Sequence, residues 1–167
     1  MLFRSGYISN LRIVNGTAVY TSAFTPPTAP LTAVANTVLL TLQSPTFIDN
    51  SGSNLTITAN TTTVKPVAIS PFTGTSYTSN TITTYGSAYF NGSTDYSYIS
   101  NTGGLQLGVG DYNIEYWVNP YSFAVTPVHL DFRLINGSTG GAIQISANTS
   151  GMITVYGGSS KIGRAHV

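Results

Sequence analysis

The sequence contains no cysteine, which excludes both disulfide bonds and metal sites built on thiolates. Charged residues make up only 7% of its 167 residues, so serine, threonine and asparagine supply most of the polar surface. No run of about 20 apolar residues is present, and a helix that spans a membrane is therefore not expected. With 41% hydrophobic residues, the chain can still bury a core of its own.

Helical periodicity is absent as well, because apolar residues do not recur three and four positions apart over any long window. Short alternating runs recur instead, and turn signals such as Asn15-Gly16 and Asn91-Gly92 separate some of them. This pattern predicts an all-β chain with two antiparallel sheets packed face to face. The expected strands are Tyr7–Val14, Thr37–Gln43, Leu55–Ala59, Val64–Ile69, Ser87–Asn91, Tyr96–Ser100, Tyr112–Asn119, Val128–Leu134, Ala142–Ala147 and Met152–Tyr156.

Alternation along these strands also predicts the core, since every second side chain points to the same face of a sheet. Apolar residues at alternate positions of a strand should therefore all face the core. The residues expected in the core are Val38, Leu40, Leu42, Leu55, Ile57, Tyr112, Ile114, Tyr116, Val118, Val128, Leu130, Phe132 and Leu134.

The two ends of the chain look foreign to the rest. Residues Ile162–Val167 match one reading frame of a common short-read sequencing adapter, and Met1–Ser5 match its reverse complement. We therefore expect residues 1–5 and 161–167 to be artefacts, which makes the absence of a signal peptide uninformative. Residues 6–160 carry three basic and five acidic side chains, a net charge of −2 in place of +1, so nucleic acid is not an expected partner.

Two segments lack strand-like alternation. Phe24–Pro30 contains three prolines, which favour an extended polyproline conformation, and we interpret this segment as a linker with a module boundary near residue 31. Ser70–Tyr85 is rich in serine and threonine and is expected to form a long surface loop.

Several segments resemble laminin G-like, concanavalin A-like modules of phage tail-fibre and other virion proteins. Gly6–Tyr20, followed by Phe24–Pro27, is similar to the closing strand and exit of such a module. The segments similar to its opening and to its next signature strands are Val38–Gln43 with Phe47–Ser51, Gly86–Tyr96 and Gly110–Val118.

The resemblance implies an antiparallel two-sheet sandwich, the concanavalin A-like jelly roll, in incomplete form. Residues 6–31 would be the C-terminal end of one module with its Pro-rich linker, and residues 32–160 a truncated second module. Because first and last strands are neighbours in such sandwiches, Tyr7–Val14 is expected to pair with strands of residues 37 onward and to shield an open sheet edge.

This fold is shared with glucanases, which raises the question whether the chain holds a pair of carboxyl groups suited to glycoside hydrolysis. Retaining glycosidases hold two carboxyl groups about 5–5.5 Å apart and inverting ones about 6.5–9.5 Å apart. The strand face that carries Glu115 has no second carboxylate, and Asp111 lies about 13 Å away along the strand. We interpret Glu115 as a hydrogen-bonded structural group and expect no catalysis.

A Ser/His/Asp arrangement would have to use His129, with Asp131 as the nearest carboxylate. Alternation places both on one strand face with Arg133, which predicts a solvent-facing ladder of charges. The sequence has no nucleophile elbow, phosphate-binding loop or dinucleotide fingerprint. The glycine-rich stretch Gly103–Gly110 lacks a following helix and is interpreted as a loop between strands.

Oxygen ligands for calcium occur in Asp49-Asn50-Ser51 and in the segment Asn91–Asp95. We interpret both as Asx turns, in which the side chain accepts hydrogen bonds from the following backbone, with structural calcium as the open alternative. Trp117 is expected to face away from the core. It could stack on a sugar, or a loop could cover it.

These observations together predict a non-enzymatic structural or adhesion module of a phage or virion surface protein, located on the virion or outside the cell, that recognises host glycans. No catalytic residue, metal ligand or cofactor is assigned, and the ligand-binding residues are left open. The expected partners are neighbouring modules of the same polypeptide and glycans or a host surface. The alternative is a bacterial secreted adhesin or carbohydrate-binding module.

Overall fold

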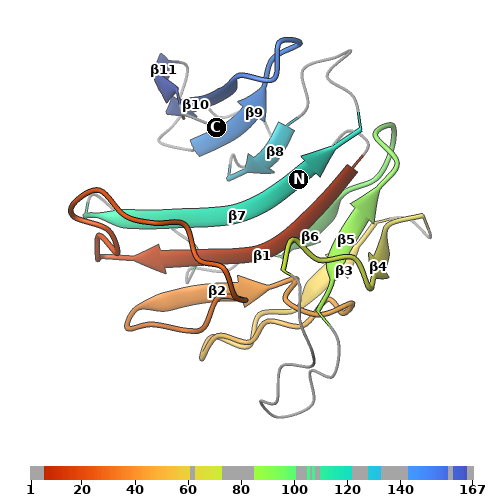
Figure 1. The fold of residues 1–167 in the computed structure, drawn as a ribbon, viewed down its shortest axis with the longest axis horizontal. Helices are drawn as coiled ribbons and strands as arrows, with labels where there is room; N and C mark the ends of the chain where they lie inside the picture. The colour runs from red at the N-terminus through yellow and green to blue at the C-terminus, as the bar shows by residue number, and fades with distance from the viewer. Residues whose placement is uncertain are drawn as a thin grey trace.

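A computed structural model describes residues 6–60, 63–72, 85–100, 105, 107, 110–121, 128–132, 143–157 and 160–164, the last range as backbone. Within these ranges the chain forms antiparallel β-strands and no α-helix (Figure 1). The strands are β1 Gly6–Asn15, β2 Thr37–Thr41, β3 Ile57–Ala59, β4 Lys65–Val67, β5 Ser87–Phe90, β6 Ser97–Ile99, β7 Tyr112–Pro120, β8 Val128–Asp131, β9 Ile143–Ala147, β10 Ile153–Gly157 and β11 Ser160–Arg164.

Strand β1 lies at the centre of the largest sheet, which curls around it (Figure 1). Strand β7 pairs with β1 along one side, from Gly6↔Pro120 to Asn15↔Tyr112. On the other side β5 pairs with the beginning of β1 and β2 with its end, while β4 extends the sheet beyond β5. The expected pairing of Tyr7–Val14 with later strands is therefore confirmed.

A bulge in the middle of β1 changes which side chains face inward. Asn10 has φ of 52° and Leu42 has φ of 60°, and the Asn10 amide donates to the Leu42 carbonyl oxygen over 2.9 Å. An extra residue in a strand interrupts the alternation of faces. As a result Ile8 and, three residues later, Leu11 both lie in buried apolar clusters.

The apolar core has two parts. The first lies under the beginning of β1 and contains Ile8, Ala88 and Phe90. The second is larger and lies between β1, β2 and β7 on one side and the sheet β11-β10-β9-β8 together with the β3–β6 pair on the other. Its buried members are Leu11, Ile13, Leu39, Leu130, Ile143 and Ile145.

Most residues of the predicted core are buried or packed in the two apolar clusters, whereas Tyr112 is not, and Val128 is half-buried and joins neither cluster. Leu40 is buried, but it pairs with Arg12 and so shares the outer face of the sheet, while Leu39 and Leu42 enter the core clusters. Tyr112, near one end of β7, is 38% exposed. Leu134 lies outside the described residues.

All ten expected strands are present, some of them shorter than predicted. Strand β11 was not expected; it lies largely in the range assigned to the adapter and pairs with β10. The strands confirm the antiparallel all-β class. The assignment of the chain ends and the division into two modules stay predictions.

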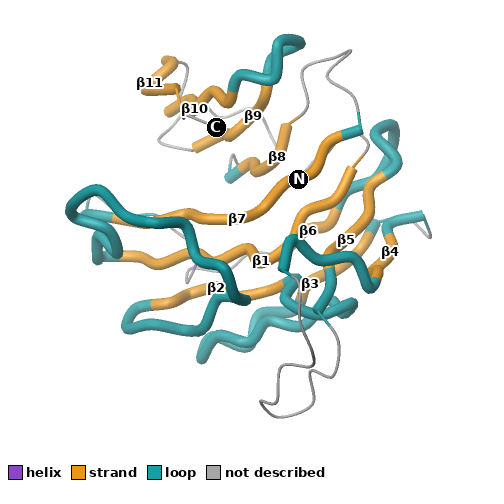
Figure 2. Tube along the Cα trace, viewed as in Figure 1, coloured by secondary structure: helices purple, strands orange, loops and turns teal. Residues whose placement is uncertain are grey.

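The segment between β1 and β2, which includes the expected linker, runs across the outer face of β7 and β1 (Figure 2). The Leu31 amide donates to Asn10 Oδ1 over 2.9 Å, and Gln43 Nε2 donates to the Leu31 carbonyl oxygen. Residues 26–29 are mostly exposed, yet the segment is anchored to the sheet on both sides of them. It covers the half of the outer face that carries Arg12 and Glu115. The half that carries Tyr7 and Trp117, called the open half below, has residues 69–72 packed against part of it within the described part of the chain.

Candidate functional site

The open half of the outer face carries aromatic and small polar side chains in two rows. Tyr7 on β1 lies between its paired neighbours Asn119 on β7 and Tyr89 on β5. In the next row, Ser9 on β1 pairs with Trp117 on β7. The residues between the two rows face the core, so alternation directs these side chains to the outside.

Three tyrosines form a cluster at one end of this surface. The ring centroid of Tyr7 lies 5.5 Å from that of Tyr89 and 5.4 Å from that of Tyr121. The hydroxyl oxygens of Tyr7 and Tyr121 are 2.5 Å apart and share a hydrogen bond. The hydrogen bond to Tyr7 raises the pKa of Tyr121. Tyr121 is 59% exposed, so the cluster offers an aromatic surface to solvent.

A cavity of about 140 Å³ adjoins this cluster. Its walls come from Trp117 on β7 and from Ile69 and Pro71 after β4. Phe72, in that same segment, packs edge-on against Trp117 with ring centroids 5.0 Å apart. Trp117 is thus half-buried: a loop residue supports one part of its ring, and another part lines the cavity.

The cavity has no charged side chain in its lining, as far as the chain is described. The Ser9 hydroxyl, which also lines the cavity, already donates a hydrogen bond to the Gly86 carbonyl oxygen over 2.6 Å. Ser87, which also lines the cavity, is 1% exposed, and its hydroxyl finds no hydrogen-bond partner within the described ranges. Such a site suits a neutral ligand with apolar surface and a few polar atoms.

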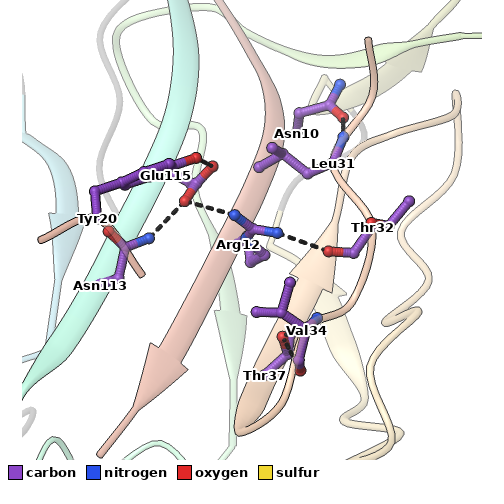
Figure 3. A network of polar contacts seen from close by, with 9 residues as sticks. All are labelled: Asn10, Arg12, Tyr20, Leu31, Thr32, Val34, Thr37, Asn113 and Glu115. Carbon is purple, nitrogen blue, oxygen red and sulfur yellow. Dashed lines mark hydrogen bonds and ion pairs between the residues drawn. The ribbon is translucent and has the colours of Figure 1, made fainter. Parts of the chain in front are cut away.

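Glu115, the candidate carboxylate of the sequence, is held in a network on the covered half of the same face (Figure 3). It accepts hydrogen bonds from Arg12 Nη2 over 2.9 Å, from Asn113 Nδ2 over 2.5 Å and from the Tyr20 hydroxyl over 3.2 Å. Arg12 Nη1 donates to the Thr32 carbonyl oxygen over 2.8 Å. Burial, with the charge of Glu115, raises the pKa of Tyr20. The expectation that Glu115 is hydrogen-bonded is confirmed; its structural role stays a prediction.

His129 does not face solvent, and the predicted ladder of charges is wrong at this position. The pairing of β8 with β9 shifts between Val128 and Leu130, which interrupts alternation and turns His129 inward to 0% exposure. Its Nδ1 lies 2.9 Å from the Tyr116 hydroxyl oxygen. Burial lowers the pKa of His129 to about 4 and raises that of Tyr116. Arg133 lies outside the described residues.

Asp49 forms the turn that the sequence predicts. Its Oδ1 accepts from the backbone amides of Leu40 and Ser51, and its Oδ2 accepts from the Ser51 hydroxyl and the Leu55 amide, at 2.8–3.0 Å. These bonds tie β2 to the turn that follows it.

The second candidate turn is built in the same way. Asn91 Oδ1 accepts from the Ser93 amide over 2.9 Å, and Asp95 Oδ2 accepts from the Asn91 amide over 2.8 Å. Among the described residues no group of three or more His, Asp or Glu side chains could hold a metal ion. Most of Gly103–Gly110 lies outside the described residues.

Sequence reasoning singled out Trp117 but missed Tyr7, Tyr89, Tyr121 and Ser87. Strand alternation directs Tyr7 outward, yet only the register of β1 with β5 and β7 shows that the others join it. No family model matches the chain, and searches of curated proteins and of solved structures find no match. In the described part of the chain, no helix has the length and apolarity needed to cross a membrane.

Proposed function

We propose that this chain is a non-enzymatic adhesion module of a phage or other virion surface protein, and that it binds neutral host glycans on the open half of its outer face. The observation that carries the proposal is the uncharged surface formed by Trp117, Tyr7, Tyr89 and Tyr121 beside the cavity. Sugars present apolar C–H faces and hydroxyl groups, which match aromatic rings bordered by hydroxyl and amide groups.

The finer fold assignment belongs to the same proposal. The larger apolar cluster lies between the five-stranded sheet on one side and the four-stranded sheet with the β3–β6 pair on the other, and this layering supports an incomplete concanavalin A-like jelly roll. The low charge and the wealth of hydroxyl and amide side chains support an extracellular or virion location with neighbouring modules of the same polypeptide as partners. The engagement of Glu115 by Arg12, Asn113 and Tyr20 supports a structural role for this carboxylate in place of a catalytic one.

The chain has one tryptophan, Trp117, so its fluorescence reports directly on the proposed surface. Titration with a panel of neutral oligosaccharides should change the Trp117 emission in a saturable way for at least one of them, and calorimetry should give the same affinity. Absence of any saturable change across the panel would overturn the proposal.

Two exposed tyrosines provide a matched pair of variants. Tyr121→Ala should weaken glycan binding about 3- to 10-fold because it removes one aromatic contact. Tyr98→Ala removes a tyrosine that is 41% exposed on β6 and does not line the cavity, and it should leave binding unchanged.

A further inference from the structure

The tyrosine cluster contains two side chains whose hydroxyl groups meet. Tyr7 on β1 and Tyr121, directly after β7, share a hydrogen bond over 2.5 Å between their hydroxyl oxygens, and their ring planes are nearly perpendicular at 85°. In each ring the two Cε carbons are bonded to the carbon that carries the hydroxyl group. The contact between the hydroxyl groups therefore brings Cε atoms of the two rings near each other.

This arrangement suits one reaction of phenols, which is oxidative coupling. Removal of one electron and one proton from a tyrosine leaves a phenoxyl radical, whose unpaired electron is shared between the oxygen and the Cε carbons. Two such radicals join through a bond between Cε atoms and form dityrosine. Because the fold already holds the two rings together, their coupling is an intramolecular step and is favoured over the encounter of two separate chains.

Both rings can be oxidised through the exposed member of the pair. Tyr121 is 59% exposed, whereas Tyr7 is half-buried between its neighbours on β5 and β7. A radical formed on Tyr121 can take a hydrogen atom from the Tyr7 hydroxyl along the hydrogen bond that they share. A second oxidation at Tyr121 then completes the pair of radicals.

The third member of the cluster is less well placed for coupling. The ring centroid of Tyr89 lies 5.5 Å from that of Tyr7, but the Tyr7 hydroxyl is hydrogen-bonded to Tyr121. The rings of Tyr89 and Tyr121 are farther apart, with centroids separated by 6.2 Å. The hydroxyl contact therefore selects Tyr7 and Tyr121 from the three.

We propose that Tyr7 and Tyr121 form an oxidative cross-linking site, at which a haem peroxidase with hydrogen peroxide joins the two rings by a Cε–Cε bond. One hydrogen peroxide molecule accepts two electrons and two protons from the two phenols and leaves as two water molecules. The hydrogens displaced from the bonded Cε atoms move to the phenol oxygens, so the chain loses two hydrogen atoms in all. This proposal is independent of glycan binding.

The bond would hold the beginning of β1 to the end of β7. Since the chain has no cysteine, a disulfide cannot do this. The two tyrosines are 114 positions apart, and a cross-link that closes a long loop strongly restricts the unfolded chain. We therefore expect the cross-link to raise the melting temperature by about 5–15 °C.

The test treats the intact chain, in dilute solution, with a haem peroxidase and hydrogen peroxide. We expect a monomer that has lost two hydrogen atoms, shows dityrosine fluorescence and melts at the higher temperature. Peptide mapping should join the peptides that carry Tyr7 and Tyr121, and free tyrosine oxidised in parallel shows that the oxidant is active. An unlinked chain, links only between separate chains, or a link between other tyrosines would overturn the proposal. A linked monomer with an unchanged melting temperature would overturn the stabilising role of the bond.

Conservative variants identify the pair. Tyr121→Phe and Tyr7→Phe each keep the ring and remove the hydroxyl that forms the radical, so each should abolish the link within the chain. The control is Tyr98→Phe, at a tyrosine on β6 that is 41% exposed and has its ring centroid 6.2 Å from that of Tyr96. This change should leave the yield of the link unaltered. A link that survives Tyr121→Phe, or that Tyr98→Phe abolishes, would contradict the assignment.

Discussion

Arg12 on β1 and Glu115 on β7 form a cross-strand ion pair, with Nη2 and Oε2 2.9 Å apart and both side chains largely buried under the segment that joins β1 to β2. Loss of one partner from such a pair leaves the other charge buried and uncompensated. The pair therefore fixes β1, β7 and the covering segment relative to one another.

Arg12→Met should destabilise the fold by about 3–5 kcal/mol, because Glu115 keeps its charge in a buried position. Urea denaturation of the variant and the parent measures the difference. The double variant Arg12→Met/Glu115→Leu removes both charges and should recover a large part of that loss. A double variant as unstable as the sum of the two single changes would contradict this account.

His129 should make the stability of the fold depend on pH. Its pKa is about 4 in the folded protein, below the ordinary value of 6.5, so the unfolded chain binds the proton more tightly. Neutral His129 therefore contributes to the free energy of unfolding, and this contribution is fully present above pH 6.5. It is lost as the pH falls toward 4, by about 3 kcal/mol in total. Urea denaturation between pH 4 and pH 8 follows this loss. His129→Gln, which does not titrate, should show a flatter profile over the same range.

Gly86→Ala should destabilise the fold by about 1–3 kcal/mol. A Cβ atom at this position would lie 2.3 Å from the Pro45 backbone nitrogen and 2.4 Å from the Ser44 carbonyl carbon, and backbone atoms cannot yield as a flexible side chain can. Gly52→Ala is the control, since a Cβ there meets nothing within 4 Å. Thermal denaturation should separate the two variants, and equal melting temperatures would refute the close packing.

Asp49→Ala should lower the free energy of unfolding by about 2–4 kcal/mol, because it leaves the backbone amides of Leu40 and Leu55 without their hydrogen-bond acceptor. Urea denaturation measures this change. Its carboxylate already accepts four hydrogen bonds from the protein. We therefore expect calcium and chelators alike to leave the melting temperature of the parent unchanged. A calcium-dependent rise that Asp49→Ala abolishes would favour the metal site over the turn.

Local alternation predicts most strands of this fold, since it depends only on neighbours in sequence. It fails where the pairing register between two neighbouring strands shifts, because the alternation of faces is interrupted there. Alternation assigned Leu40 and His129 to the wrong faces, because the pairing of β1 with β2 shifts between Ile13 and Val14 and that of β8 with β9 shifts between Val128 and Leu130. The tyrosine cluster was missed for a related reason: Tyr7 and Tyr121 are 114 residues apart, and only the register of β1 with β7 brings them together.

The central position of β1 also bears on how the chain reaches this fold. Strand β1 has its longest pairing with β7, about a hundred residues later in the chain, so one of its edges stays without this partner until β7 has been synthesised. Contacts this distant in sequence slow folding and prolong the time in which an open edge can pair with another chain. Nascent chains that end before residue 112 should therefore need protection from aggregation.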